Sequence, residues 1–146
     1  MQHGPQHWYE LYFSLLEREK LNQSVTFDDV FREIFRATHR NEPSFCSKLV
    51  ATIRPEMPVY DSYVRENLSL NTPRPHQPRE TRLQGFLRAY SVLEETIAHL
   101  LTDQRYSQLK IAFDEKYPLY SHLTDTKKLD LVLWQYRKPN SGNSIA

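Results

Sequence analysis

Two residues near the middle of the chain carry side chains that could do chemistry. Asp61 follows an extended Pro-Val-Tyr segment and precedes residues with helical spacing, so its carboxylate is expected to cap a helix. Cys46 lies near the start of an apolar helix, where the helix dipole can lower the pKa of a thiol and make it nucleophilic. Its neighbours Phe45 and Leu49 favour a buried, inert thiol instead. Whether the carboxylate does more than cap the helix stays open at this point.

The histidines do not form a convincing metal site. His3 and His7 have the i, i+4 spacing of a helical ligand pair, but they flank Pro5 close to the start of the chain. The remaining histidines are scattered, and none pairs with a neighbouring carboxylate or with Cys46. The prediction is that the chain holds no metal, and nothing in the sequence implies a cofactor.

Basic residues gather in two places, in and after a proline-rich segment and around the end of the chain. Such groups could bind phosphates through salt-dependent contacts. Acidic residues are interspersed with both groups, which favours solvated faces of mixed charge. The two groups are Arg74, Arg79, Arg82 and Arg88, and Lys127, Lys128, Arg137 and Lys138.

Length and composition are those of one globular domain. The 146 residues are enough for a single hydrophobic core, and the net charge of +1 gives no general attraction to nucleic acid or anionic membranes. The single cysteine excludes an internal disulfide, and three dispersed glycines exclude a P-loop or a dinucleotide-binding turn. No apolar run approaches the roughly 20 residues of a membrane span, and no signal region opens the chain. We expect a cytoplasmic protein without membrane contact.

Apolar residues at 3.6-residue spacing predict an all-α fold, a compact bundle of six or seven helices. Thr26, Ser44 and Asp61 are expected N-caps, and Thr102 or Asp103 and Thr124 or Asp125 are expected to begin the last two helices. The predicted helices cover residues 8–20, 27–38, 44–54, 61–68, 81–101, 103–117 and 124–136. Phe45, Tyr117 and Tyr136 are assigned to inward faces.

Three prolines in residues 71–78 exclude helix and central strand there. The segment is expected to be either an ordered crossing or a mobile linker. The helices on either side are too few for two separate cores. The sequence therefore predicts one helical domain over residues 1–138, followed by a disordered polar tail at 139–146.

The central stretch resembles the core of the helix-hairpin-helix DNA glycosylases, and within them a bacterial branch similar to the 8-oxoguanine glycosylases. The string SKLVATIRPEMPVYDSYV carries the resemblance, which covers about residues 26–68. TFDDVFREIFRAT would be the first hairpin helix, HRNEPS the turn and FCSKLVATIRP the second helix. In that superfamily the hairpin grips the DNA backbone, and a following aspartate stabilises cationic sugar character or activates a nucleophile.

The resemblance implies roles for particular residues. Asp61 would be the key carboxylate, and Lys48 a nucleophile or a phosphate contact. Tyr60 and Tyr63 would form the walls of a pocket that receives a damaged base. The residues expected to contact DNA are Arg40, Asn41, Ser44, Tyr60, Tyr63 and Arg65. No cofactor is implied, because base excision needs only protein groups and water.

The chain departs from the family pattern in two ways. The hairpin turn of the family is usually Gly-x-Gly, whereas HRNEPS has no glycine and Pro43 lacks an amide hydrogen. Lys48 lies closer to Asp61 than the catalytic lysine of bifunctional members does. The alternative hypothesis is therefore a non-catalytic helical binding module, a degenerate relative of the same fold, with a protein partner.

Overall fold

A computed structural model describes residues 5–136, which form seven α-helices and one 3-10 turn without any strand. The all-α prediction is confirmed. In chain order the elements are α1 (Pro5–Glu19), α2 (Phe27–Thr38), α3 (Pro43–Ile53), α4 (Ser62–Asn67), α5 (Arg79–Leu101), α6 (Gln104–Lys116), η1 (Pro118–Tyr120) and α7 (Asp125–Gln135). The predicted tail at 139–146 and His3 lie outside the described residues.

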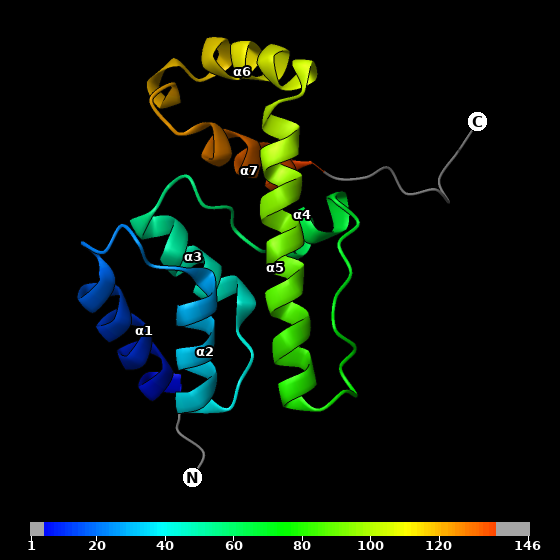
Figure 1. The fold of residues 1–146 in the computed structure, drawn as a ribbon. Helices are drawn as coiled ribbons and strands as arrows, with labels where there is room; N and C mark the ends of the chain where they lie inside the picture. Colours follow the sequence, from blue (N-terminus) through cyan, green and yellow to red (C-terminus); the bar gives the residue numbers. More distant parts are fainter. Residues whose placement is uncertain (1–4, 137–146) are drawn as a thin grey trace.

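The long helix α5 is the centre of the arrangement (Figure 1). Helices α1, α2 and α3 form a layer on one side of it, in which α3 contacts both α1 and α2, and α2 contacts α5. Helix α6 crosses one end of α5, and α7 packs against α4, α5 and α6. None of the helices within residues 5–136 is both long and apolar enough to cross a membrane.

The core lies between this layer and α5. The ring of Phe27 stacks on Tyr90 of α5 with centroids 4.0 Å apart, and on Phe31 at 5.0 Å. Phe31, Ile34 and Leu93 are completely buried beside them. Aromatic pairs of this kind contribute about 0.5–1.5 kcal/mol beyond their buried area. The apolar face of α2, which the spacing of its residues predicts, is the face that holds the layer on α5.

Most of the predicted helix starts are confirmed by side-chain caps. Thr26 accepts a hydrogen bond from the amide of Asp29 at 3.1 Å, Asp103 from Arg105 at 2.8 Å, and Thr124 from Lys127 at 3.1 Å. The assignment of Ser44 as a cap is wrong. Helix α3 begins one residue earlier, because Pro43 occupies its first turn, where the missing amide hydrogen costs nothing.

Three aromatic residues assigned to inward faces are substantially exposed. Phe45 packs edge-on against Trp8 and Tyr12 of α1 but remains 42% exposed, because α1 covers only part of its ring. Tyr117 and Tyr136 each follow the last residue of a helix, so the helical spacing no longer directs them inward. Helical spacing therefore assigns too many aromatic residues to the buried faces near the ends of these helices.

The proline-rich segment 71–78 runs along α5 (Figure 1). Its Pro73 lies against Gly85, in the N-terminal third of that helix. A Cβ atom at position 85 would lie 2.5 Å from Cγ of Pro73, closer than carbon atoms approach each other in folded proteins. The glycine therefore makes room for the proline ring.

We predict that Gly85→Ala destabilises the protein. Alanine normally stabilises a helix interior by about 1 kcal/mol relative to glycine, but forcing a methyl group into this contact should outweigh that gain. The expected net loss is about 1–2 kcal/mol in the free energy of unfolding, measured by denaturant titration. Gln84→Ala, at the exposed neighbouring position, is the control and should stay within about 0.5 kcal/mol. Equal or greater stability of Gly85→Ala would show that the contact with Pro73 imposes no constraint.

Candidate functional site

Helices α2 and α3 pack side by side and are joined by residues 39–42, so they form a helical hairpin (Figure 1). His39 ends α2 in the left-handed conformation with φ 57°, and its amide donates to the carbonyl of Phe35 at 2.7 Å. A histidine thus performs the chain reversal that glycine commonly performs at the end of a helix. The turn leads directly into Pro43 at the start of α3.

A hollow of about 420 Å³ lies beside this turn, and we call it the Asp61 hollow. Its walls come from the start of α3, from the segment that enters α4, and from the proline-rich segment. The lining residues are Glu42, Pro43, Ser44, Phe45, Tyr60, Asp61, Ser62, Arg65, Thr72, Pro73 and Pro75. Of the residues that the sequence assigns to a site, the structure brings Ser44, Tyr60, Asp61 and Arg65 together here.

Asp61 both caps a helix and faces this hollow. Its Oδ1 accepts a hydrogen bond from the amide of Val64 at 2.8 Å, which confirms the predicted cap of α4. The carboxylate is only partly buried, and it lines the Asp61 hollow. Capping occupies one position of a group that can accept several hydrogen bonds, so the cap leaves the carboxylate able to accept from a ligand.

Tyr60 is 5% exposed, and its ring stands edge-on to Phe86 of α5 with centroids 6.3 Å apart. Its hydroxyl is buried and makes no hydrogen bond of normal length, although Thr72 lies beside it. Burial raises the pKa of this hydroxyl. Phe45, not Tyr60, presents an exposed ring to the hollow.

Arg65 is the basic residue that lines the Asp61 hollow. Its Nη1 donates to Oγ1 of Thr72 at 2.8 Å, which holds the guanidinium against the proline-rich segment. Arg40 reaches the rim through an ion pair with Glu42 at 3.1 Å. Asp61, Glu42 and Arg65 all line the hollow, which therefore carries charges of both signs.

The other predicted site residues lie outside the hollow. Lys48 is exposed on α3, with its Nζ 5.9 Å from the ring centroid of Phe45. Asn41 donates to the carbonyl of Arg79 at 3.4 Å and so joins the hairpin turn to the start of α5. Tyr63 stands edge-on to Trp134 of α7, with centroids 6.5 Å apart. The structure therefore does not place Lys48 and Tyr63 as walls around Asp61.

The segment that carries Tyr60 and Asp61 is extended and buried at Pro58, Val59 and Tyr60. Side chains from three helices satisfy its backbone groups. Ser47 of α3 accepts from the amide of Tyr60 at 2.9 Å, and Tyr90 of α5 donates to the carbonyl of Pro58 at 3.0 Å. Asp130 of α7 accepts from the amide of Val59 through Oδ2 at 3.2 Å. These bonds determine where Asp61 stands.

Asp130 is a residue that sequence reasoning misses, because the basic residues around it in the chain favour a solvated face of mixed charge. It is 5% exposed, and its Oδ1 has no hydrogen-bond partner. Burial raises the pKa of Asp130 to about 7, and the nearby negative charge of Asp61 adds to the shift. The amide of Val59 and the charge of Lys127 oppose it. The one available signal was its position beside the inward-facing Leu129 of the last helix.

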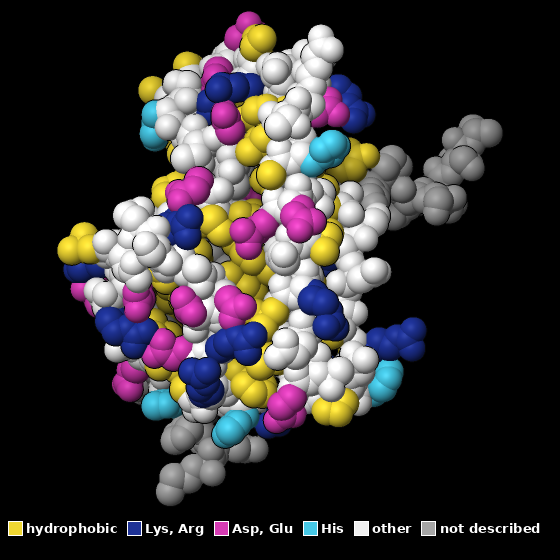
Figure 2. All heavy atoms as spheres, in the orientation of Figure 1, with side chains coloured by type: hydrophobic (Ala, Val, Ile, Leu, Met, Phe, Trp, Pro, Cys, Tyr) yellow, Lys and Arg dark blue, Asp and Glu magenta, His cyan; other side chains and the backbone are white. Residues whose placement is uncertain are grey.

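The remaining candidates from the sequence are Cys46, the histidines and the two basic groups. Cys46 is completely buried, and burial raises the pKa of its thiol far above neutral pH, so it is not an activated nucleophile. Among residues 5–136 no cluster of three or more metal-binding side chains occurs. Basic and acidic side chains are interspersed over the face of the molecule shown in Figure 2.

Comparison with known proteins adds no relative. No protein-family model matches the chain, and neither a curated protein nor a solved structure is significantly similar to it.

We predict that two substitutions of Asp61 differ in their effect on stability, because only one of them removes the helix cap. Asp61→Ala removes the acceptor for the amide of Val64 and should lower the free energy of unfolding by about 1 kcal/mol. Asp61→Asn keeps a good capping side chain and should remain within about 0.5 kcal/mol of the parent. Denaturant unfolding measures both. If Asp61→Asn were as unstable as Asp61→Ala, the negative charge itself would be part of the cap.

Asp130 should make stability depend on pH. Its pKa is raised in the folded state, so the folded protein binds more protons than the unfolded chain between the ordinary pKa of about 3.9 and about 7. Stability is therefore lost as pH rises through this window. Between pH 5 and pH 8 the parent should lose about 2–3 kcal/mol relative to Asp130→Asn, measured by denaturant unfolding at each pH.

Glu115→Gln, at an exposed position of α6, is the control for a general effect of removing one negative charge. It should follow the pH dependence of the parent. Parallel pH profiles of the parent and Asp130→Asn would show that Asp130 is ionised without penalty in the folded protein.

Proposed function

We propose that the chain is a DNA-binding, glycosylase-like protein whose Asp61 hollow receives part of a nucleotide. The observation that carries the proposal is the meeting of the hairpin turn, Asp61 and Arg65 at one open hollow. A volume of about 420 Å³ is within the range of about 300–1,000 Å³ typical of ligand sites. The resemblance to helix-hairpin-helix glycosylases supports the proposal, because it implies a hairpin turn and an aspartate beside a DNA-binding site; Lys48 and Tyr63, which it also implies there, lie outside the hollow.

The lining residues support distinct parts of the proposed interaction. Arg65 offers a guanidinium that can contact a phosphate, with Arg40 at the rim. The exposed ring of Phe45 offers a surface on which a base can stack. The carboxylate of Asp61 can stabilise positive charge that develops on a sugar when the bond to its base breaks. Excision of a damaged base is thus the activity to test.

A second candidate is a non-catalytic helical module with a protein partner. It is favoured by the hairpin turn without glycine and by the position of Lys48, whose amine lies above the Phe45 ring outside the hollow. Acidic Glu42 beside Arg40 also weakens the attraction of the rim for a polyanion. In this case Asp61 acts only as the cap of α4.

The test is binding to a duplex with an abasic site and to the undamaged duplex, measured by fluorescence anisotropy at about 50 and about 200 mM salt. We expect preference for the abasic duplex and weaker binding at the higher salt. Arg65→Ala should weaken binding several-fold and reduce the salt slope by about one phosphate contact. Asp61→Asn should keep the binding and lose any base excision.

Arg105→Ala is the matched control, because Arg105 is an exposed arginine on α6, distant in the fold from the Asp61 hollow. It should bind as the parent does. Equal binding to both duplexes that Arg65→Ala leaves unchanged would contradict the proposal and favour the non-catalytic module.

A further inference from the structure

A second hollow lies at the other end of the molecule, between the end of α6, the η1 turn and α7. We call it the α6–α7 groove. It has a volume of about 760 Å³ and is lined by Phe113, Lys116, Tyr117, Tyr120, Leu131, Val132, Gln135 and Tyr136. None of these residues lines the Asp61 hollow. The two surfaces can therefore be tested independently.

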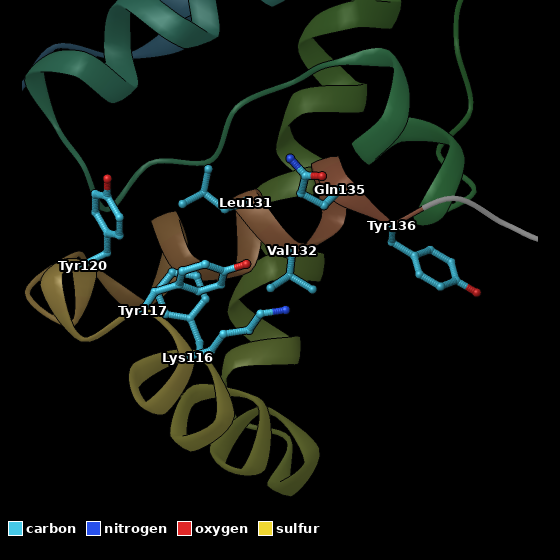
Figure 3. Close-up of a pocket in the computed structure, with 8 residues that line it drawn as sticks. Lys116, Tyr117, Tyr120, Leu131, Val132, Gln135 and Tyr136 are labelled. Atoms are coloured by element: carbon cyan, nitrogen blue, oxygen red, sulfur yellow. The ribbon is translucent and has the colours of Figure 1, made fainter.

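The groove has an apolar floor and a polar rim. Phe113, Leu131 and Val132 are half-buried in it. Tyr117 is 43% exposed and Tyr120 54% exposed. In Figure 3, Lys116 and Tyr117 extend from the end of α6 alongside Val132, and Tyr120 projects from the η1 turn. Tyrosine is enriched in protein–protein interfaces and among the residues that contribute most of their binding energy.

Lys116 is the charged residue in this lining. It forms no ion pair with any residue in the described range 5–136, and its Nζ lies 5.5 Å from the ring centroid of Tyr117. Among the acidic side chains of α6 and α7, Asp114 pairs with Lys128 at 2.7 Å and Asp125 with Lys110 at 3.0 Å, while Asp130 is buried. Glu115 is exposed next to Lys116 in the chain and forms no ion pair with it. A carboxylate of a bound partner could therefore form an ion pair with Lys116.

We propose that the α6–α7 groove is a docking site for a short apolar segment of another protein that carries an acidic side chain. Aliphatic or aromatic residues of the segment would lie on Phe113, Leu131 and Val132. Its carboxylate would pair with Lys116. The hydroxyls of Tyr117 and Tyr120 and the amide of Gln135 would bond to its backbone, which distinguishes a peptide from a lipid chain without hydrogen-bonding groups.

The experiment selects ligands for the full-length chain from a library of short random peptides. We expect enrichment of sequences that combine aliphatic or aromatic residues with Asp or Glu. An enriched peptide is then synthesised with a fluorophore and titrated with the protein. The double variant Tyr117→Ala/Tyr120→Ala should weaken binding at least about tenfold, as truncation of paired interface tyrosines commonly does.

Lys116→Glu tests the charge. It should weaken the acidic peptide several-fold and favour a peptide in which lysine replaces the acidic residue. Tyr9→Ala is the matched control, because Tyr9 on α1 is 56% exposed, nearly the same as Tyr120. It should bind like the parent, and circular dichroism should show that all variants remain folded.

Three results would overturn the proposal. The first is no enrichment, or enrichment of sequences without acidic residues. The second is binding that the groove variants leave unchanged. The third is a concentration-dependent dimer in sedimentation experiments that Tyr117→Ala/Tyr120→Ala abolishes, because a second copy of this chain would then occupy the groove. DNA binding by these variants should match the parent, so failure here is distinguishable from failure of the DNA proposal.

Discussion

The fold depends on satisfying a stretch of buried backbone that is not helical. Pro58, Val59 and Tyr60 pass through the interior in an extended conformation, so they cannot use the internal hydrogen bonds of a helix. Each buried backbone group left without a partner costs about 1–3 kcal/mol. Ser47, Tyr90 and Asp130 supply partners from three different helices. The segment can therefore be buried only where α3, α5 and α7 meet, which determines the packing of all three.

The need to satisfy this buried backbone also explains why a carboxylate is buried near the candidate site, although burial is unfavourable for its charge. Asp130 is buried with one oxygen unpartnered, and its charge is unfavourable there. Its other oxygen holds the amide of Val59, two residues before Asp61. The bond thus sets the point from which the chain enters α4 with Asp61 as its cap. Proteins commonly accept such local costs where a side chain must be positioned.

Features that depend on neighbouring residues, such as helices and their caps, can be predicted from the sequence. Features that depend on contacts between distant segments cannot. The helix of residues 27–38 and the cap at Asp61 follow from local spacing and side-chain type, and both are confirmed. The placing of Ser44 and Arg65 in one hollow depends on where the start of α3 lies relative to α4, which no local pattern contains. Likewise, the sequence gives no reason for a glycine at position 85, which only the contact with Pro73 explains. Its role comes from a contact between segments twelve residues apart.

Helix α7 connects the two candidate surfaces. Its Asp130 faces the segment leading to the Asp61 hollow, while the next residues, Leu131 and Val132, line the α6–α7 groove. Lys128 is buried and bonds to Asp114 and to the carbonyl of Ser121, so it fixes the η1 corner of the groove. Of the buried polar residues within 5–136, all but Ser47 lie on α7. Removing Asp114 would leave the buried charge of Lys128 uncompensated, so this pair resists displacement of α7. The position of α7 therefore affects the geometry of both the Asp61 hollow and the α6–α7 groove.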